Sequence, residues 1–386
     1  MDVFKELDQH LVERWQAIQA RKEAGDKCIG YLPSSLMPEE LLQACGAVPV
    51  PLIRGGEPEA VTASRAWVPR FVDTFMRAQA GYRFLAEEPA YQIIDSVAVA
   101  ISDNNTKVVA DTFEHYASLK VIRLGVPHEN SQEAYQYYLQ GLRLVKEQLE
   151  NFTGAEITDE KIWDAIRISN EMNRLLEQIS SVRCRLDAPL TGKDFIRLVH
   201  GSYMAEPARM IDILKSALAE LNGKEGIKGN FVRILITGST LAVGDYKVVD
   251  LVEELGGMVV FEQFAEGIRE YWERIPEQGD PLEALASRYI KQSVPPPFWR
   301  PAKERHDFII RKAKECSADA VIWYQLMYRD GYDIESWYFP QILEERANLP
   351  MLKLESDYDA SERRLFRTRI EALIESASGR RNAYAQ

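Results

Sequence analysis

Short apolar runs alternate with amphipathic stretches along most of this chain. Runs rich in β-branched and aromatic residues are short enough to be buried parallel strands, and apolar positions spaced three and four residues apart are typical of helices. Strands are predicted over residues 27–32, 47–52, 93–101, 120–126, 232–237, 258–262, 320–324 and 351–355. Helices are predicted over residues 68–85, 112–119, 246–255, 302–316, 333–346 and 361–376. This alternation predicts parallel, doubly wound sheets.

The middle of the chain breaks this rhythm. Residues 131–222 contain helical runs over 135–151 and 158–186 and no comparable strand. A chain of 386 residues is also long for a single hydrophobic core. The sequence therefore predicts an α/β fold of two doubly wound, mainly parallel four-stranded lobes, residues 1–130 and 229–386, joined by a helical segment over residues 131–228.

The densest polar and aromatic chemistry follows the third strand of the second lobe. Residues 320–324 are strongly apolar, and the turn after them contains Arg329 and Asp330 before a helix that Asp333 is predicted to cap. Functional groups of open α/β sheets gather at the carboxyl ends of strands. We therefore expect Arg329 and Asp330 to take part in catalysis, together with Tyr324 at the end of the strand.

A matching turn follows the third strand of the first lobe. It contains Asp103, Asn104 and Asn105, which are residue types that often do no more than cap helices and shape turns. The two turns occupy corresponding places, so two facing lobes would bring them to opposite walls of one cleft. On this basis we expect Asp103 to be catalytic and the two asparagines to contact a substrate.

Four more side chains are candidates for substrate binding. Arg269 and Arg300 each offer a planar fork that suits a carboxylate or a phosphate. Surface or structural ion pairing explains such arginines equally well. Trp323 and Tyr328 belong to an aromatic cluster whose usual place is a core or an interface. A flat apolar substrate would give some of these rings a second role.

The remaining features mainly exclude classes of function. The net charge of −12, with no basic tract to offset it, argues against a nucleic-acid partner. The loop over residues 238–245 lacks the ending of a P-loop, so a plain strand-to-helix turn is favoured over an anion cradle, and no ATP-hydrolysing site is expected. The first helix lacks the apolar core of a signal peptide, and no apolar run reaches membrane length. We expect a cytoplasmic protein without a membrane partner.

The cysteines carry no metal signature. Cys28, Cys45, Cys184 and Cys316 are widely separated, form no CxxC pair, and have no histidine at metal-ligand spacing. The favoured interpretation of each is a small core hydrophobe.

Several short motifs occur in a fixed order along the chain. They are GYLP, PEEL and GAVP at residues 30–33, 38–41 and 46–49, IWYQLMYRDGYDIES at 322–336, and ESDYD and RTRIEA at 355–359 and 367–372. Together they resemble the 2-hydroxyacyl-CoA dehydratase/benzoyl-CoA reductase superfamily over nearly the whole chain. Within that family, residues 322–336 are most similar to the smaller core subunit of ATP-dependent benzoyl-CoA reductase.

The resemblance implies one component of a heterotetramer. Two related core subunits, of which the larger is the expected partner of this chain, bind an aromatic acyl-CoA. Two ATPase/activator-type subunits bind MgATP and share an iron–sulfur cluster, and reduced ferredoxin supplies the electrons. The implied product of benzoyl-CoA is a cyclohexa-1,5-diene-1-carbonyl-CoA. A component of a 2-hydroxyacyl-CoA dehydratase is the alternative, because it shares the fold and the electron supply.

The chain departs from the family at three turns where cluster-bearing members carry cysteines. Residues 65–70, 102–105 and 328–330 contain no cysteine, and iron–sulfur clusters are generally held by thiolates. We therefore expect this chain to ligate no metal and another subunit to hold the 4Fe–4S or related cluster. Trp67 and Arg70 of the first turn are expected to line the acyl-CoA site. A degenerate scaffold that keeps the fold and adds no chemistry remains the other interpretation.

Overall fold

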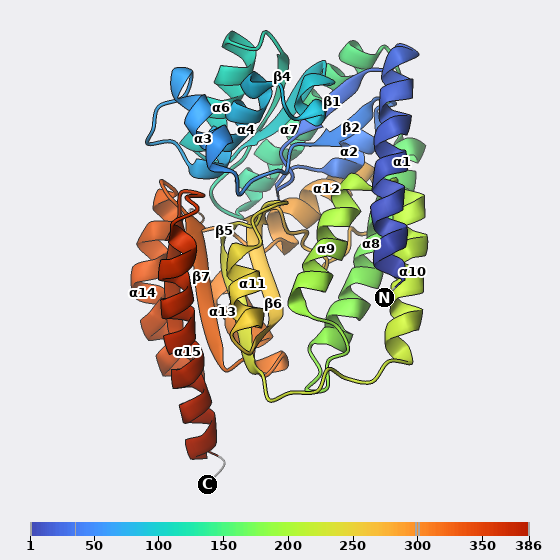
Figure 1. Cartoon of the computed structure of the whole chain (residues 1–386). Helices are drawn as coiled ribbons and strands as arrows, with labels where there is room; N and C mark the ends of the chain where they lie inside the picture. The colour runs from blue at the N-terminus through green and yellow to red at the C-terminus, as the bar shows by residue number, and fades with distance from the viewer. Residues whose placement is uncertain (1, 35, 298, 300–301, 385–386) are drawn as a thin grey trace.

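Two parallel sheets organise the computed structural model, which describes residues 2–34, 36–297, 299 and 302–384 (Figure 1). The first sheet has the strand order β2-β1-β3-β4 and the second the order β6-β5-β7-β8. The strands are β1 (Cys28–Tyr31), β2 (Val48–Pro51), β3 (Ser96–Ile101), β4 (Lys120–Gly125), β5 (Val232–Thr240), β6 (Gly257–Glu266), β7 (Ala320–Leu326) and β8 (Met351–Ser356). The predicted α/β fold with two parallel four-stranded sheets is confirmed.

Helices surround both sheets and fill the region between them. They are α1 (Val3–Glu23), α2 (Glu39–Ala44), α3 (Pro58–Ala63), α4 (Thr74–Leu85), α5 (Pro89–Gln92), α6 (Asn104–His115), α7 (Gln132–Thr153), α8 (Asp159–Arg183), α9 (Gly192–Met204), α10 (Pro207–Asn222), α11 (Lys247–Glu254), α12 (Pro281–Ala286), α13 (Lys303–Glu315), α14 (Asp330–Ala347) and α15 (Glu362–Tyr384). The strand-free stretch is α7 to α10, and α1 lies along α10 (Figure 1). Within the described residues, no helix is both long and apolar enough to cross a membrane.

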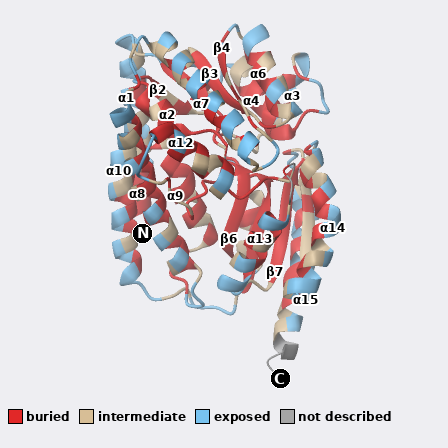
Figure 2. Cartoon of the chain, turned by 180° about the vertical axis from the view of Figure 1, so that it is seen from behind, coloured by how far each residue is buried: buried red, intermediate tan, exposed pale blue. Residues whose placement is uncertain are grey.

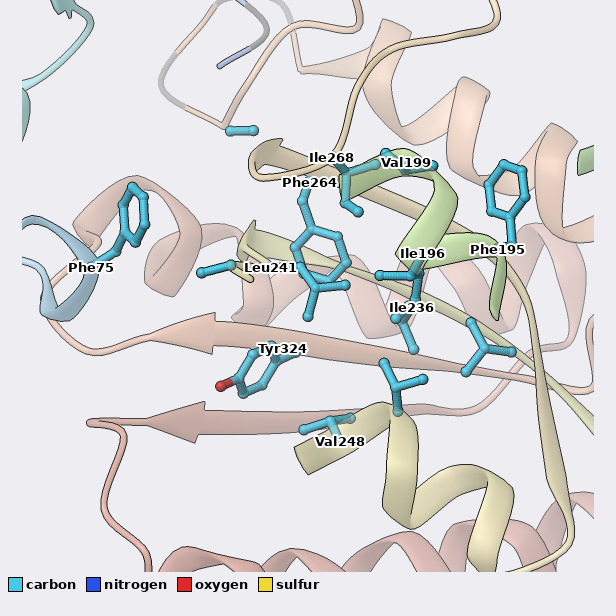
Figure 3. Close-up of a cluster of buried hydrophobic side chains, with 14 of the residues drawn as sticks. Phe75, Phe195, Ile196, Val199, Ile236, Leu241, Val248, Phe264, Ile268 and Tyr324 are labelled. Carbon is cyan, nitrogen blue, oxygen red and sulfur yellow. The ribbon is translucent and has the colours of Figure 1, made fainter. Parts of the chain in front are cut away.

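Three strands of the second sheet are covered on both faces, as parallel strands usually are. Every residue of β5, β6 and β7 is buried, and Figure 2 shows these strands in the buried colour between helices with exposed outer faces. Figure 3 shows Ile236 of β5 and Phe264 of β6 among apolar side chains that include Phe195 and Ile196 of α9. Burying each such side chain contributes about 1.5–3 kcal/mol, so this packing fixes the second sheet against α9.

The first sheet ends at an edge strand made of alternating valine and proline. The backbone N–H groups of Val48 and Leu52 donate toward β1, to the carbonyl oxygens of Lys27 and Tyr31, both at 2.8 Å. Pro49 lies between these donors, at the position whose N–H would face away from β1. Proline has no backbone N–H, and within sheets it is confined mainly to edge strands.

Several predicted boundaries were wrong near the ends of the strands. Helix α6 begins at Asn104, because the Asp103 side chain accepts a hydrogen bond from the backbone N–H of Thr106 and caps the helix. Helix α14 begins at Asp330, so Asp333 lies in its first turn and is not its cap. Strand β5 runs to Thr240 and β6 to Glu266, so residues 238–240 belong to a strand and not to the predicted turn.

Two of the cysteines are not the independent core hydrophobes that were predicted. Cys184 and Cys316, at the ends of α8 and α13, form a disulfide with a Cα–Cα distance of 4.6 Å. Cys28 and Cys45 are free and buried, as predicted. The pairing was hidden in the sequence because 132 residues separate the two positions.

The carboxyl ends of the two sheets face each other. Ser34, after β1, forms an isolated bridge with Glu266 at the end of β6, and the backbone N–H of Thr74 donates to the carbonyl oxygen of Met327 at 3.4 Å. In parallel α/β sheets, functional groups gather at this edge. A functional site is therefore expected at this junction.

Candidate functional site

Three turns far apart in the sequence meet at this junction. The side chain of Asn105 connects them: its Oδ1 accepts from the backbone N–H of Asp73 at 2.9 Å, and its Nδ2 donates to the carbonyl oxygen of Tyr328 at 3.2 Å. The turn before α4, the start of α6 and the turn after β7 are thus held side by side. The two turns predicted to face each other across the lobes are in direct contact.

A buried arginine lies at the centre of these turns. Arg329 is 2% exposed, and its Nη2 lies 2.9 Å from Oε1 of Glu266 and 3.4 Å from Oδ2 of Asp103. The Thr240 hydroxyl donates to the other Glu266 oxygen at 2.9 Å. Burial raises the pKa of Glu266, and the Arg329 charge opposes that shift. Burial likewise disfavours the charge on Arg329, but Glu266, Asp103 and Asp73 together hold its pKa well above the usual range.

Asp73 adds a third carboxyl group near Arg329. It is fully buried and caps α4 by accepting from the backbone N–H of Met76 at 3.0 Å. Burial raises the pKa of Asp73 to about 7. Its Oδ2 and the Nη1 of Arg329 are both buried without a hydrogen-bond partner among the described residues. Buried polar atoms normally find partners, so these two mark a place for a polar group from a ligand or water.

An open hollow of about 550 Å³ adjoins two of the three turns, the one before α4 and the one after β7. Its lining combines basic, apolar and aromatic residues: Arg65, Val68, Pro69, Arg70, Arg77, Tyr328 and Asp357. Arg77 is buried, is hydrogen-bonded to Asp357, and lies 5.5 Å from the ring centre of Tyr328. Arg65 and Arg70 are exposed. The hollow therefore offers an aromatic ring and guanidinium groups, a combination suited to an anionic ligand with a flat part.

A second buried polar cluster lies beyond Glu266. Arg269 donates to Oε2 of Glu39 at 2.8 Å, and both line a small cavity of about 30 Å³ together with Glu40. Burial raises the pKa of Glu39, and Arg269 opposes the shift. Ser34 borders this cavity and is the bridge partner of Glu266. Arg269 is thus in an internal ion pair and does not line the open hollow.

Two aromatic residues predicted for the site are enclosed within the second lobe. The Tyr324 hydroxyl donates to Oδ2 of Asp245 at 2.5 Å, and burial raises the pKa of Asp245 to about 6. In Figure 3 this hydroxyl points away from the apolar cluster around the ring. Trp323 is fully buried and donates from Nε1 to Gln325 at 2.8 Å. Neither ring lines the open hollow.

The other predicted residues have varied surroundings. Asp330 and Asn104 are exposed at the first positions of α14 and α6. Trp67 is partly buried and stacks on Phe84 with ring centres 4.0 Å apart, next to the turn that carries Arg70. Arg300 lies outside the described residues.

Glu266, Asp73 and Asp357 also belong to the site, although no sequence pattern assigned them to it. Glu266 ends a strand whose residues are all buried, and a glutamate in such a strand is a signal for an internal partner. Asp73 directly precedes an amphipathic helix, which is the ordinary place for a cap. Asp357 is in one of the quoted motifs, but its partners Thr74 and Arg77 are almost three hundred residues away, so no local pattern connects them.

The residues at the three turns do not fit an iron–sulfur cluster bound by thiolates. Such clusters need several cysteine ligands, and here the space between the turns holds Arg329 and Asn105. Two of the chain's cysteines are bonded to each other, and Cys28 and Cys45 are buried elsewhere. Over the described ranges, no group of three or more His, Cys, Asp or Glu side chains is arranged to hold a metal.

Comparisons with known proteins give this geometry a family context. The chain is 23% identical over 359 residues to the (R)-phenyllactyl-CoA dehydratase beta subunit of Clostridium sporogenes, covering 92% of this chain and 93% of that protein. It is 22% identical to the lactoyl-CoA dehydratase subunit beta of Anaerotignum propionicum, covering 92% and 93%. It is 20% identical to a benzoyl-CoA reductase subunit of Thauera aromatica, covering 83% and 82%.

These relatives include both kinds of protein that the motifs resembled, so the predicted superfamily is confirmed. The family model described as 2-hydroxyglutaryl-CoA dehydratase, D-component, matches residues 34–377, which include all three turns of the site. The chain belongs to the 2-hydroxyglutaryl-CoA dehydratase D-component family.

Proposed function

We propose that this chain is a core subunit of an acyl-CoA-transforming complex, in which it forms one wall of the acyl-CoA site and ligates no cluster itself. The observation that carries this proposal is the convergence of the three turns on Arg329, Glu266 and Asp103. Cluster-bearing members of the family that the motifs resemble carry their cysteines at these turns. An ion pair occupies their meeting point here, so the iron–sulfur cluster belongs to a homologous partner subunit.

The open hollow is the proposed entrance for the acyl-CoA. Coenzyme A carries several phosphate groups, and arginine forks bind phosphate in two-point contacts. Arg65 and Arg70 are exposed on this hollow, and the half-exposed ring of Tyr328 offers a surface for a flat acyl group. Arg77 is already engaged with Asp357 and supports the wall.

The buried centre supplies groups that suit the reacting end of the substrate. The unpartnered Nη1 of Arg329 is a charged donor for the thioester oxygen, and a hydrogen bond there strengthens as negative charge develops in a water-poor site. Asp73, with its pKa raised to about 7 by burial, holds a proton on a large fraction of molecules at neutral pH. It is our candidate proton donor. Arg329, Asp103, Asn105 and Arg70 keep the roles expected from the sequence.

The proposed reaction is the ATP-dependent reduction of benzoyl-CoA to a cyclohexa-1,5-diene-1-carbonyl-CoA. Its support is the similarity of residues 322–336, which contain Tyr328 and Arg329, to the smaller core subunit of such reductases. The other subunits would bind MgATP and accept electrons from ferredoxin. Dehydration of a 2-hydroxyacyl-CoA is the second candidate. It is supported by the phenyllactyl- and lactoyl-CoA dehydratase subunits among the relatives.

The test uses the chain assembled with its homologous core partner and activator subunits under anaerobic conditions. Iron and acid-labile sulfide are measured on the isolated chain and on the complex, and products are followed from benzoyl-CoA and from phenyllactyl-CoA. We expect iron only in the complex and ring reduction without dehydration. Stoichiometric iron in the isolated chain contradicts the cluster-free subunit, and dehydration alone selects the second candidate.

Arginine variants distinguish a chain that binds the acyl-CoA from a chain that is only a structural scaffold. Arg65→Gln and Arg70→Gln together should raise the KM for the acyl-CoA about tenfold, which corresponds to the loss of about 1.4 kcal/mol of binding. Arg311→Gln on α13 is the matched control, because Arg311 is exposed and pairs only weakly with Glu315 at 3.7 Å. An unchanged KM in the double variant would show that these arginines do not bind the acyl-CoA and would support the scaffold interpretation.

A further inference from the structure

A buried guanidinium holds the backbones of two cysteines together. Arg233 of β5 is 5% exposed and donates from Nη2 to the carbonyl oxygen of Cys184 at 2.7 Å. The same side chain donates from Nε to the carbonyl oxygen of Cys316 at 2.9 Å. A third bond joins Nη1 to the carbonyl oxygen of Arg185 at 3.1 Å. These bonds involve no sulfur atom, so they keep the ends of α8 and α13 adjacent whether or not the disulfide is formed.

The disulfide is also reachable from outside. Cys184 and Cys316 both line a hollow of about 250 Å³, separate from the acyl-CoA site, whose walls include Phe261, Tyr271 and Lys312. Cys184 is only partly buried, whereas Cys316 is 2% exposed. A small solute entering the hollow therefore meets the sulfur of Cys184 first.

Charged groups of both signs surround the disulfide: Arg233 and Lys312 are cationic, and Glu177 and Glu315 also line the hollow. Arg233 contacts the cysteine backbones, and Lys312 lines the same hollow, where it pairs with Glu315 at 2.8 Å. Nearby cations stabilise a thiolate relative to a thiol. Thiol–disulfide exchange proceeds through thiolates, and a better-stabilised leaving thiolate departs faster. Arg233 and Lys312 thus favour a departing thiolate, whereas Glu177 and Glu315 oppose it, and we expect exchange to depend on the two cations.

We propose that Cys184 and Cys316 form an exchangeable redox pair whose reactant is a small thiol. The thiolate of that solute attacks Sγ of Cys184, the bond between the two cysteines breaks, and Cys316 leaves as a thiolate that takes up a proton. A second small thiol then attacks the sulfur atom of the first small thiol in the mixed disulfide. Cys184 leaves as a thiolate and takes up a proton. The products are two cysteine thiols and one oxidised small-molecule disulfide, so two electrons pass from two thiols to the protein. This property is independent of the proposed acyl-CoA chemistry.

Glutathione is the probe for the test. The full chain is equilibrated with mixtures of reduced and oxidised glutathione, remaining thiols are alkylated in the folded state, and labelled peptides are quantified by mass spectrometry. We expect Cys184 and Cys316 to convert together while circular dichroism stays constant, with Cys28 and Cys45 unlabelled. A pair that stays oxidised until the chain is denatured, or that never oxidises, overturns the proposal.

Single cysteine variants test the direction of attack. Cys316→Ser should trap one glutathione on Cys184, whereas Cys184→Ser should leave Cys316 at least tenfold slower to react. Equal or reversed reactivity contradicts the proposed access from the hollow. Cys28→Ser is the matched control and should exchange like the parent chain.

Two charge variants test the role of the surroundings. Arg233→Gln removes the bonds that hold the two backbones together and also a nearby charge, which act in opposite directions; we expect the first effect to dominate and to move the midpoint of the glutathione titration toward the dithiol. If that variant does not fold, Lys312→Gln gives a second test and should slow exchange several-fold with the fold intact. Unchanged exchange in the variants that fold would show that these cations play no part and would overturn the assigned mechanism.

Discussion

A single carboxyl group, Asp73, gives the clearest consequence at the scale of the residue. Burial raises its pKa to about 7, whereas the unfolded chain releases the same proton near the ordinary value of about 3.9. Between these two pH values the folded state binds more protons than the unfolded state. The free energy of unfolding contributed by this group therefore falls as the pH rises from about 4 to 7.

Asp73→Asn should remove this loss, because an amide still caps a helix and does not ionise. Relative to the parent chain, the variant should gain at most about 1.4 kcal/mol of stability for each pH unit across the window. Urea unfolding midpoints at pH 5, 6, 7 and 8 measure the difference. Asp212→Asn, at an exposed position of α10, is the control. Parallel curves for the parent and Asp73→Asn would contradict the raised pKa.

At the scale of the element, the centre of the second sheet depends on one glycine. Gly238 of β5 pairs with Tyr324 of β7, and a Cβ atom at this glycine would lie 1.5 Å from the backbone carbonyl oxygen of Tyr324. Backbone atoms of a central strand have no room to yield, so even alanine forces the two strands apart.

Gly238→Ala should lower the free energy of unfolding by about 3 kcal/mol, in the upper range of overpacking effects. Gly223→Ala is the matched control, because a Cβ there meets nothing within 4 Å. Denaturant midpoints for both variants give the comparison. Equal midpoints would show that β5 and β7 separate at little cost.

The same elements explain how far the sequence alone could lead. Apolar runs identified all eight strands because parallel strands are buried on both faces. The ends of β5 and β6 were missed because Thr240 and Glu266 are polar. A polar residue after an apolar run normally indicates that the strand has ended, unless the residue has a buried partner. Glu266 finds that partner in Arg329, more than sixty residues further along the chain. Two of the site's turns were located from the sequence because they follow strands. Their ion pairs could not be predicted, because they join residues of different lobes that are far apart in the sequence.

At the scale of the whole molecule, Asp357 provides one of the contacts that join the two lobes. Its Oδ1 accepts from the Thr74 hydroxyl at 2.7 Å and binds the buried guanidinium of Arg77. Thr74 and Arg77 belong to α4 of the first lobe, whereas Asp357 follows β8 of the second. Arg77 is buried whereas Asp357 is partly exposed, so removing the carboxylate leaves the guanidinium charge without its partner inside the protein.

Asp357→Asn should therefore loosen the junction. Amide hydrogen exchange at residues 72–77 and 327–330 should become at least tenfold faster, while the interior of the second sheet keeps its protection. Asp359→Asn, in the same turn but exposed, is the control. Exchange that is unchanged in Asp357→Asn would show that other contacts fix the lobes.

The valine–proline strand at the margin of the first sheet has a consequence for assembly. A strand from another chain can extend a sheet only if the outer edge offers backbone donors and acceptors. Along β2 the donors of Val48 and Leu52 are already used toward β1, and Pro49 and Pro51 supply none. Recruitment of a further strand is thereby blocked on this side. Association with another subunit at this edge must proceed through side-chain surfaces, and the same arrangement protects this edge from edge-to-edge aggregation.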